Sequence, residues 1–142
     1  MIASEARQRG YEGIHCTLTL QQPAPTVIVL RITGTDVGEF GQGPMKTLDD
    51  WLVGSDQIDF FIDARDGRGV SIAVSAEWAQ WLGNNKARLK AITMLTGSRM
   101  IQITAEFVRR FSALEGMMWI CTQDEVFDGA LQNSLRSDSA GG

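Results

Sequence analysis

Charged and hydroxyl side chains gather in one short stretch of this chain, directly after an apolar segment that ends at Asp63. Arginines beside the start of a helix can bind a phosphate or carboxylate, because the free N–H groups there favour negative charge. Gly67 and Gly69 would let the backbone approach such a ligand closely. The alternative is a solvated loop in which Arg65 and Asp66 pair at little net gain. The candidate residues of this anion- or partner-binding site are Asp63, Arg65, Asp66, Arg68, Ser71, Ser75 and Trp78.

Two serines of this stretch, Ser71 and Ser75, are candidate phosphorylation sites. A phosphate on Ser75 would lie at the N-terminus of the helix predicted to begin there, where the helix dipole stabilises negative charge. The simpler interpretation is that Ser75 caps this helix through its side-chain oxygen, which contributes about 1 kcal/mol. The sequence alone leaves both interpretations open.

No set of nucleophile, base and orienting residue can be named, so the chain is expected not to be an enzyme. His15 is the only histidine, and the neighbouring Cys16 points to the opposite face of a predicted strand. With only Cys121 besides, the spacing matches no known set of metal ligands, so neither a metal nor another cofactor is expected.

The bulk composition is that of a globular chain of 142 residues with a formal net charge of −4. The acidic balance argues against nucleic-acid binding, which uses a basic face. The longest apolar run, at residues 27–30, is far too short for a membrane span. The first ten residues lack the apolar segment of a secretory signal, and a cytoplasmic location is expected.

The elements that must position the candidate residues alternate between strands and helices. A proline-containing turn joins the first two strands and predicts a hairpin. The order ββαβαβαβα predicts an α/β fold with a mixed, mostly parallel five-stranded sheet and about four helices. Residues 1–12 and 134–142 are polar and expected to be disordered, which leaves one domain at 13–133. Strands are predicted at 14–20, 26–33, 58–63, 89–95 and 117–121, and helices begin near 44, 75, 99 and 122.

Four segments carry a family resemblance that spans about residues 14–131: VIVLRITGTD, IDFFIDARD, LKAITMLTGSRMIQITAEFVRRF and MWICTQDEVFDGAL. With them the chain resembles the STAS superfamily, in particular the anti-sigma factor antagonist-like (SpoIIAA-like) subgroup, which shades into lipid-binding Sec14-type domains. The resemblance implies a non-catalytic regulatory module that binds a protein partner. Some such domains are switched by phosphorylation within an Asp-Ser-x-Gly motif after the third strand. Asp63 matches the acid of that motif, but neither Ser71 nor Ser75 is followed by glycine.

Two functions are therefore weighed for this chain. As a partner-binding module it would use residues 65–74 and the helix from Ser75. As a carrier of a small apolar ligand or lipid it would use a pocket between sheet and helices, lined by residues 100–111 and 36–43. Trp78 and Trp81 share a helix face, either within the core or as a contact surface. The edge of the first strand could also pair with a second copy and give a homodimer.

Overall fold

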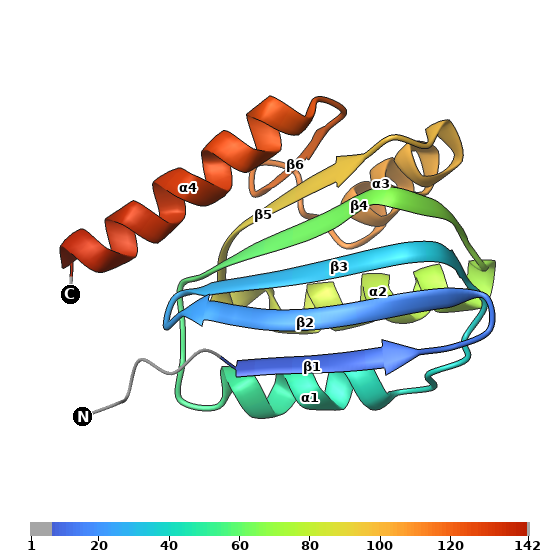
Figure 1. Cartoon of the computed structure of the whole chain (residues 1–142), viewed down its shortest axis with the longest axis horizontal. Helices are drawn as coiled ribbons and strands as arrows, with labels where there is room; N and C mark the ends of the chain where they lie inside the picture. Colours follow the sequence, from blue (N-terminus) through green and yellow to red (C-terminus); the bar gives the residue numbers. More distant parts are fainter. Residues whose placement is uncertain (1–6, 142) are drawn as a thin grey trace.

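The computed structural model describes residues 7–141, which form one six-stranded sheet with helices on both faces (Figure 1). A single 3-10 turn, Lys86–Arg88, precedes the fifth strand. The strands are β1 (Arg7–Glu12), β2 (Cys16–Ala24), β3 (Val27–Asp36), β4 (Ile58–Val70), β5 (Leu89–Thr96) and β6 (Met118–Cys121). The helices are α1 (Gly43–Leu52), α2 (Ile72–Asn85), α3 (Arg99–Phe111) and α4 (Asp124–Gly141).

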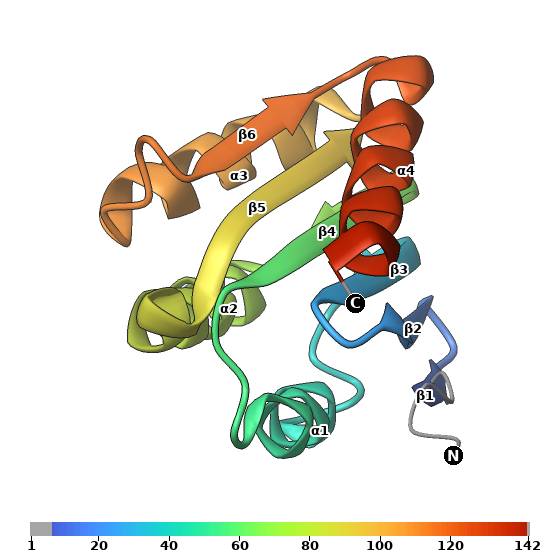
Figure 2. The same cartoon turned by 90° about the vertical axis from the view of Figure 1, so that its left-hand side faces the viewer.

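The strands lie in the sheet in the order of the chain, from β1 to β6. The first two pairings are antiparallel and the remaining three are parallel. Parallel neighbours need a crossover connection, and α1, α2 and α3 supply these three crossovers. All three cover one face of the sheet, whereas α4 covers the other (Figure 2). The predicted α/β class, with a mixed, mostly parallel sheet, is confirmed, but the sheet has six strands rather than five.

The additional strand, β1, lies in the segment 1–12 that was expected to be disordered. It pairs antiparallel with β2, and Tyr11 anchors it. The Tyr11 ring lies 5.6 Å from the Phe40 ring, and its hydroxyl donates a hydrogen bond of 3.1 Å to the Gly43 carbonyl. A single aromatic anchor produces no alternating pattern, so the sequence did not predict this strand. The rest of the segment, residues 1–6, lies outside the described residues.

Strand β4 continues to Val70, so most of the loop expected at 64–74 is strand. Two register shifts in its pairing with β3 accommodate the additional residues. A Cβ at Gly67 would lie 3.0 Å from the Ile101 Cδ1 of α3, so glycine here permits close strand–helix packing. The prediction of a loop was wrong because the glycine was taken as a sign of flexibility.

The C-terminal segment 134–142, also expected to be disordered, forms the second half of α4 as far as Gly141. Leu135 packs against the apolar cluster beneath α4, and the Thr26 hydroxyl hydrogen-bonds the Asp138 carboxylate. Tertiary packing of this kind, rather than local propensity, supplies most helix stability. Gly142 lies outside the described residues. None of the described helices is both long and apolar enough to cross a membrane.

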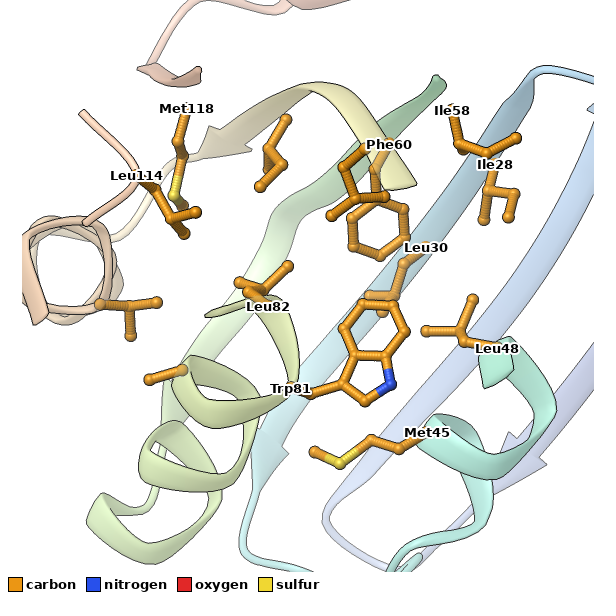
Figure 3. Packing of buried hydrophobic residues seen from close by; sticks show 14 of the residues in the cluster. Ile28, Leu30, Met45, Leu48, Ile58, Phe60, Trp81, Leu82, Leu114 and Met118 are labelled. Atoms are coloured by element: carbon orange, nitrogen blue, oxygen red, sulfur yellow. The ribbon is translucent and has the colours of Figure 1, made fainter. Parts of the chain in front are cut away.

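Apolar clusters lie on both faces of the sheet. The larger cluster lies between the sheet and helices α1, α2 and α3 (Figure 3). There Trp81 packs against Phe60 with ring centroids 6.0 Å apart, and its indole N–H donates to Asp49 at 2.8 Å. The smaller cluster, under α4, is centred on Phe61 and the fully buried Phe127. Of the two interpretations left open for Trp81, the structure supports the core.

Candidate functional site: an apolar cavity beneath α2 and α3

A cavity of about 100 Å³ lies between the sheet and the two helices α2 and α3. Strands β2 to β6 form its floor, and the inner faces of both helices form its walls. Its lining is almost entirely aliphatic, aromatic or thioether carbon, as in Ile62, Met94 and Val108. Concave, mostly apolar spaces with a few polar groups are where proteins bind small molecules.

The floor of the cavity is a row of side chains from neighbouring strands. Register places Leu30 of β3 beside Ile62 of β4, and Ile62 beside Met94 of β5. Ile62 and Met94 point toward the helices from the middle of the sheet, yet both are only partly buried. They keep this exposed surface because they border the cavity rather than a helix side chain.

Only three of the side chains that line the cavity are polar and able to accept a hydrogen bond from a ligand through oxygen: Asp36, Ser75 and Thr104. Asp36 ends β3 on the same face as Leu30, and only 5% of its surface is exposed. One of its carboxylate oxygens accepts a hydrogen bond of 2.9 Å from the Gly38 amide. Its own carbonyl accepts from the Ser71 amide at 2.9 Å, which holds the start of α2 next to it.

Two of the predicted site residues, Ser75 and Trp78, line this cavity. Both lie on α2, and Trp78 packs edge-on against Trp81 with ring centroids 5.9 Å apart. Ser75 is not the helix cap. Ser71 takes that role, since its side chain accepts a hydrogen bond of 3.2 Å from the Val74 amide. The prediction of the cap was wrong because α2 begins at Ile72, one turn earlier than expected.

Two further predicted residues, Asp63 and Arg65, lie on the opposite face of the sheet, beneath α4. Arg65 Nε donates to Asp63 at 3.0 Å, and its terminal nitrogens donate to Asp124 at 3.3 Å and Asp128 at 2.8 Å. These hydrogen bonds, first to Asp128 and then to Asp63, raise the pKa of Arg65 above its ordinary range. Arg31 supplies a second partner for Asp63 at 3.3 Å. The guanidinium of Arg65 is therefore occupied in holding α4, and the sheet separates it from the cavity.

The remaining two predicted residues, Asp66 and Arg68, are exposed near the end of β4. Neither side chain takes part in a salt bridge within the described residues. The seven predicted residues thus do not form one site, because consecutive side chains of a strand point to opposite faces.

Helix α3 carries an exposed apolar stripe, which is Met100, Ile103, Phe107 and Phe111. The rings of Phe107 and Phe111 stack with centroids 5.7 Å apart and planes within 11°. Residues three or four apart share a helix face, so these four form one strip beside the cavity-facing side of α3. Large exposed apolar strips on a protein surface mark interaction sites.

Three side chains of types that often act in catalysis, His15, Cys16 and Glu39, lie at or near the turn before β2. His15 contacts Glu39 at 3.2 Å on the surface, and Glu39 also accepts hydrogen bonds from the Ile14 and His15 amides. Partial desolvation raises the pKa of Glu39, but these hydrogen bonds outweigh it and hold the pKa below its ordinary value of 4.5. Burial, reinforced by the charges of Asp36 and Glu39, raises the pKa of Cys16 to about 11, which keeps the thiol protonated.

Neither a family model nor a curated protein matches this chain. A similar solved structure is that of an uncharacterized protein from the DUF3478 family, with a SpoIIAA-like fold, from Shewanella loihica PV-4. The two chains are 12% identical, with a TM-score of 0.62 over 85% of this chain and 98% of that chain. This chain has a SpoIIAA-like fold. The resemblance predicted from the sequence is confirmed for the fold, and function has to be argued from the site.

Sequence reasoning placed a pocket against the sheet, lined by residues 100–111 and 36–43. The cavity is lined by several residues of the first segment but only by Asp36 of the second. Sequence reasoning did not single out Asp36, because an acid between glycines is typical of a solvated turn. Thr104 lies within residues 100–111, the segment expected to line the pocket, but no sequence pattern indicated a role for it as a hydrogen-bonding group. Strand alternation from Leu30 to Asp36 is the one signal that could have placed Asp36 on the inner face.

Proposed function

We propose that this chain is a non-catalytic module that binds a small apolar ligand in the cavity beneath α2 and α3. The single observation that carries this proposal is the cavity of about 100 Å³ with its nearly continuous apolar lining. Water gains few partners in such a space, whereas an apolar ligand is removed from water and contacts Ile62, Met94 and Trp78.

The volume sets the size of the ligand portion that is enclosed. An engineered apolar cavity of about 150 Å³ is dry and binds benzene. The smaller cavity of about 100 Å³ therefore suits one small ring or a chain of a few carbons. Longer ligands would place only one end here.

The non-catalytic part of the proposal is supported by the chemistry of the reactive side chains. The Cys16 thiol is buried and protonated, and His15 lies on the surface paired with Glu39. Neither residue lines the cavity.

The test is an NMR titration of the ¹⁵N-labelled protein with toluene. We expect amide shifts to change around the cavity, and expect Ala105→Leu to abolish them because Ala105 is buried in the cavity wall. Ala76→Leu is the matched control, since Ala76 is exposed on the outer side of α2. Ala64→Val fills the cavity from the sheet and serves if Ala105→Leu does not fold. Shifts that persist in a folded, filled variant would contradict the proposal.

A second candidate function is binding of a protein partner, as the SpoIIAA-like resemblance implies for a regulatory module. The exposed stripe on α3 favours it, because aromatic side chains anchor protein interfaces. Phe107→Glu should abolish recovery of a partner that the wild-type protein retains. Arg68→Glu tests the end of β4, the surface first suggested by the sequence. Light scattering of the same variants distinguishes a second copy of this chain from a different protein.

A further inference from the structure

The polar residues of the cavity indicate which class of ligand it would bind. This inference rests on the proposed function. Asp36 places a carboxylate in a wall that is mostly apolar. Only 5% of the surface of this residue is exposed. Within the described residues it has no salt-bridge partner. A buried carboxylate without a positive partner is costly, so a ligand that supplies one gains binding free energy.

The neighbouring hydroxyl groups cannot offer a ligand their protons. Ser75 Oγ donates to the Ile72 carbonyl at 2.8 Å, and Thr104 Oγ1 donates to the Met100 carbonyl at 3.1 Å. Each hydroxyl therefore faces the cavity as an acceptor. Because Asp36 is also an acceptor, all three of these oxygen-bearing side chains can pair with a hydrogen-bond donor of the ligand.

The charges around the cavity also favour a ligand that donates hydrogen bonds. None of the described residues that line the cavity is an arginine, lysine or histidine, so no positively charged side chain in the lining complements an anionic ligand. The start of α2 is held next to Asp36 by the hydrogen bond from the Ser71 amide to the Asp36 carbonyl, and a helix N-terminus favours negative charge nearby.

We propose that the cavity selects apolar molecules whose polar end is an amine or a hydroxyl group, directed at Asp36. An apolar molecule that ends in a carboxylate or phosphate is rejected, because it would place a second negative charge and further acceptors beside this carboxylate.

The test compares four compounds that share one ring: toluene, benzylamine, benzyl alcohol and benzoate. NMR titration of the full chain should give benzylamine an affinity at least about tenfold higher than benzoate, since hydrogen bonds to a charged group contribute of that order. Benzyl alcohol should lie between them. Asp36→Asn keeps an oxygen for the Gly38 amide, removes the charge and should weaken benzylamine about tenfold while toluene binding is unchanged. Asp66→Asn is the matched control, since Asp66 is exposed and lies outside the cavity.

The outcomes separate the two proposals. If toluene binds but benzoate binds as tightly as benzylamine, the selectivity inference is overturned and the ligand-binding proposal stands. A preference for benzylamine that survives Asp36→Asn also overturns the inference. If none of the four compounds produces shifts around the cavity, the proposed function and the inference fall together.

Discussion

Ser71 and Ser75 have the same side chain four residues apart and opposite hydrogen-bond roles. Ser71 accepts from the Val74 amide and so satisfies a free donor at the start of α2. Ser75 donates to the Ile72 carbonyl inside the first turn and so satisfies none of the free amides there. This difference in donor and acceptor predicts a difference in stability.

We expect Ser71→Ala to lower the free energy of unfolding by about 1 kcal/mol, because the cap is lost. Ser75→Ala is the matched control and should change it by less than about 0.5 kcal/mol. Urea denaturation of the three proteins measures both values. Equal losses in the two variants would contradict the assignment of Ser71 as the cap.

At the scale of single residues, the sequence named candidate residues but could not predict their partners. Asp63 and Arg65 were expected at a ligand site, and they lie instead in an ion-pair network with α4. The carboxylates of Asp124 and Asp128 that complete this network are about 60 residues away in the sequence. Local spacing carries no information about such contacts.

Among the elements, α4 has a polar link to the sheet through one arginine. Arg65 joins Asp63 of β4 to Asp124 and Asp128 of α4, and its guanidinium lies 5.8 Å from the centre of the Phe127 ring. Removing one member of a partly buried ion network leaves the others uncompensated.

Arg65→Met should lower the free energy of unfolding by about 2 kcal/mol, less than for a fully buried pair because Asp124 and Asp128 are exposed to solvent. Arg68→Met is the control on the same strand and should have an effect within about 0.5 kcal/mol. Urea denaturation gives both values, and hydrogen exchange should show the loss of protection concentrated in α4. A loss of protection spread evenly over the chain would contradict this role.

Hydrogen bonds from the turn before β2 to the Glu39 carboxylate hold the connection between β3 and α1. The pKa of Glu39 is lowered in the folded protein, so this contact stabilises the fold above pH 4.5, the ordinary value. The stabilisation is lost as the pH falls through the lowered pKa.

Protection factors of the Ile14 and His15 amides should therefore decrease when the pH is lowered below 4.5. Hydrogen exchange followed by NMR measures them, with amides in the middle of β3 as the internal reference. Glu39→Gln should remove the pH dependence, and a variant that retained it would show that another group titrates.

The elements themselves were largely predictable, because apolar periodicity marks each strand and helix of the central region. The failures are at the ends of the chain and in β4. β1 and the second half of α4 are polar and owe their order to Tyr11 and Leu135, which dock on distant parts of the fold. Tertiary contacts override weak local propensity at both places.

For the whole molecule, the sheet separates two apolar layers of unequal size. Phe127 is the centre of the smaller layer, where it meets Phe61 edge-on with ring centroids 5.7 Å apart. Phe107 has the same side chain but lies on the surface of α3 with 60% of its area exposed. The two positions therefore provide a matched pair for measuring how far the smaller layer stabilises the domain.

Phe127→Ala should lower the free energy of unfolding by about 3–5 kcal/mol, as for other buried phenylalanines. Phe107→Ala should cost less than about 1 kcal/mol, since it removes mainly the stacking with Phe111. Both values come from urea denaturation followed by circular dichroism. Similar losses in the two variants would mean that the layer under α4 contributes little.

The cavity is also a property of the whole molecule. Most of the elements that border it were predictable, yet the empty space arises only where α2 and α3 fail to cover the row from Leu30 to Met94. Packing gaps depend on how several side-chain volumes add together in three dimensions. A pattern read along one chain cannot supply that sum.

The placement of α4 has a consequence for synthesis on the ribosome. Each strand from β1 to β6 joins the one made just before it, so the sheet can grow continuously as the chain emerges. The surface around Val29 and Phe61 nevertheless stays bare until the final helix is released, because no earlier segment of the described chain covers it. A nascent chain arrested before residue 124 therefore has all six strands but presents one uncovered apolar face of the sheet, and it is this intermediate that chaperones would be expected to recognise.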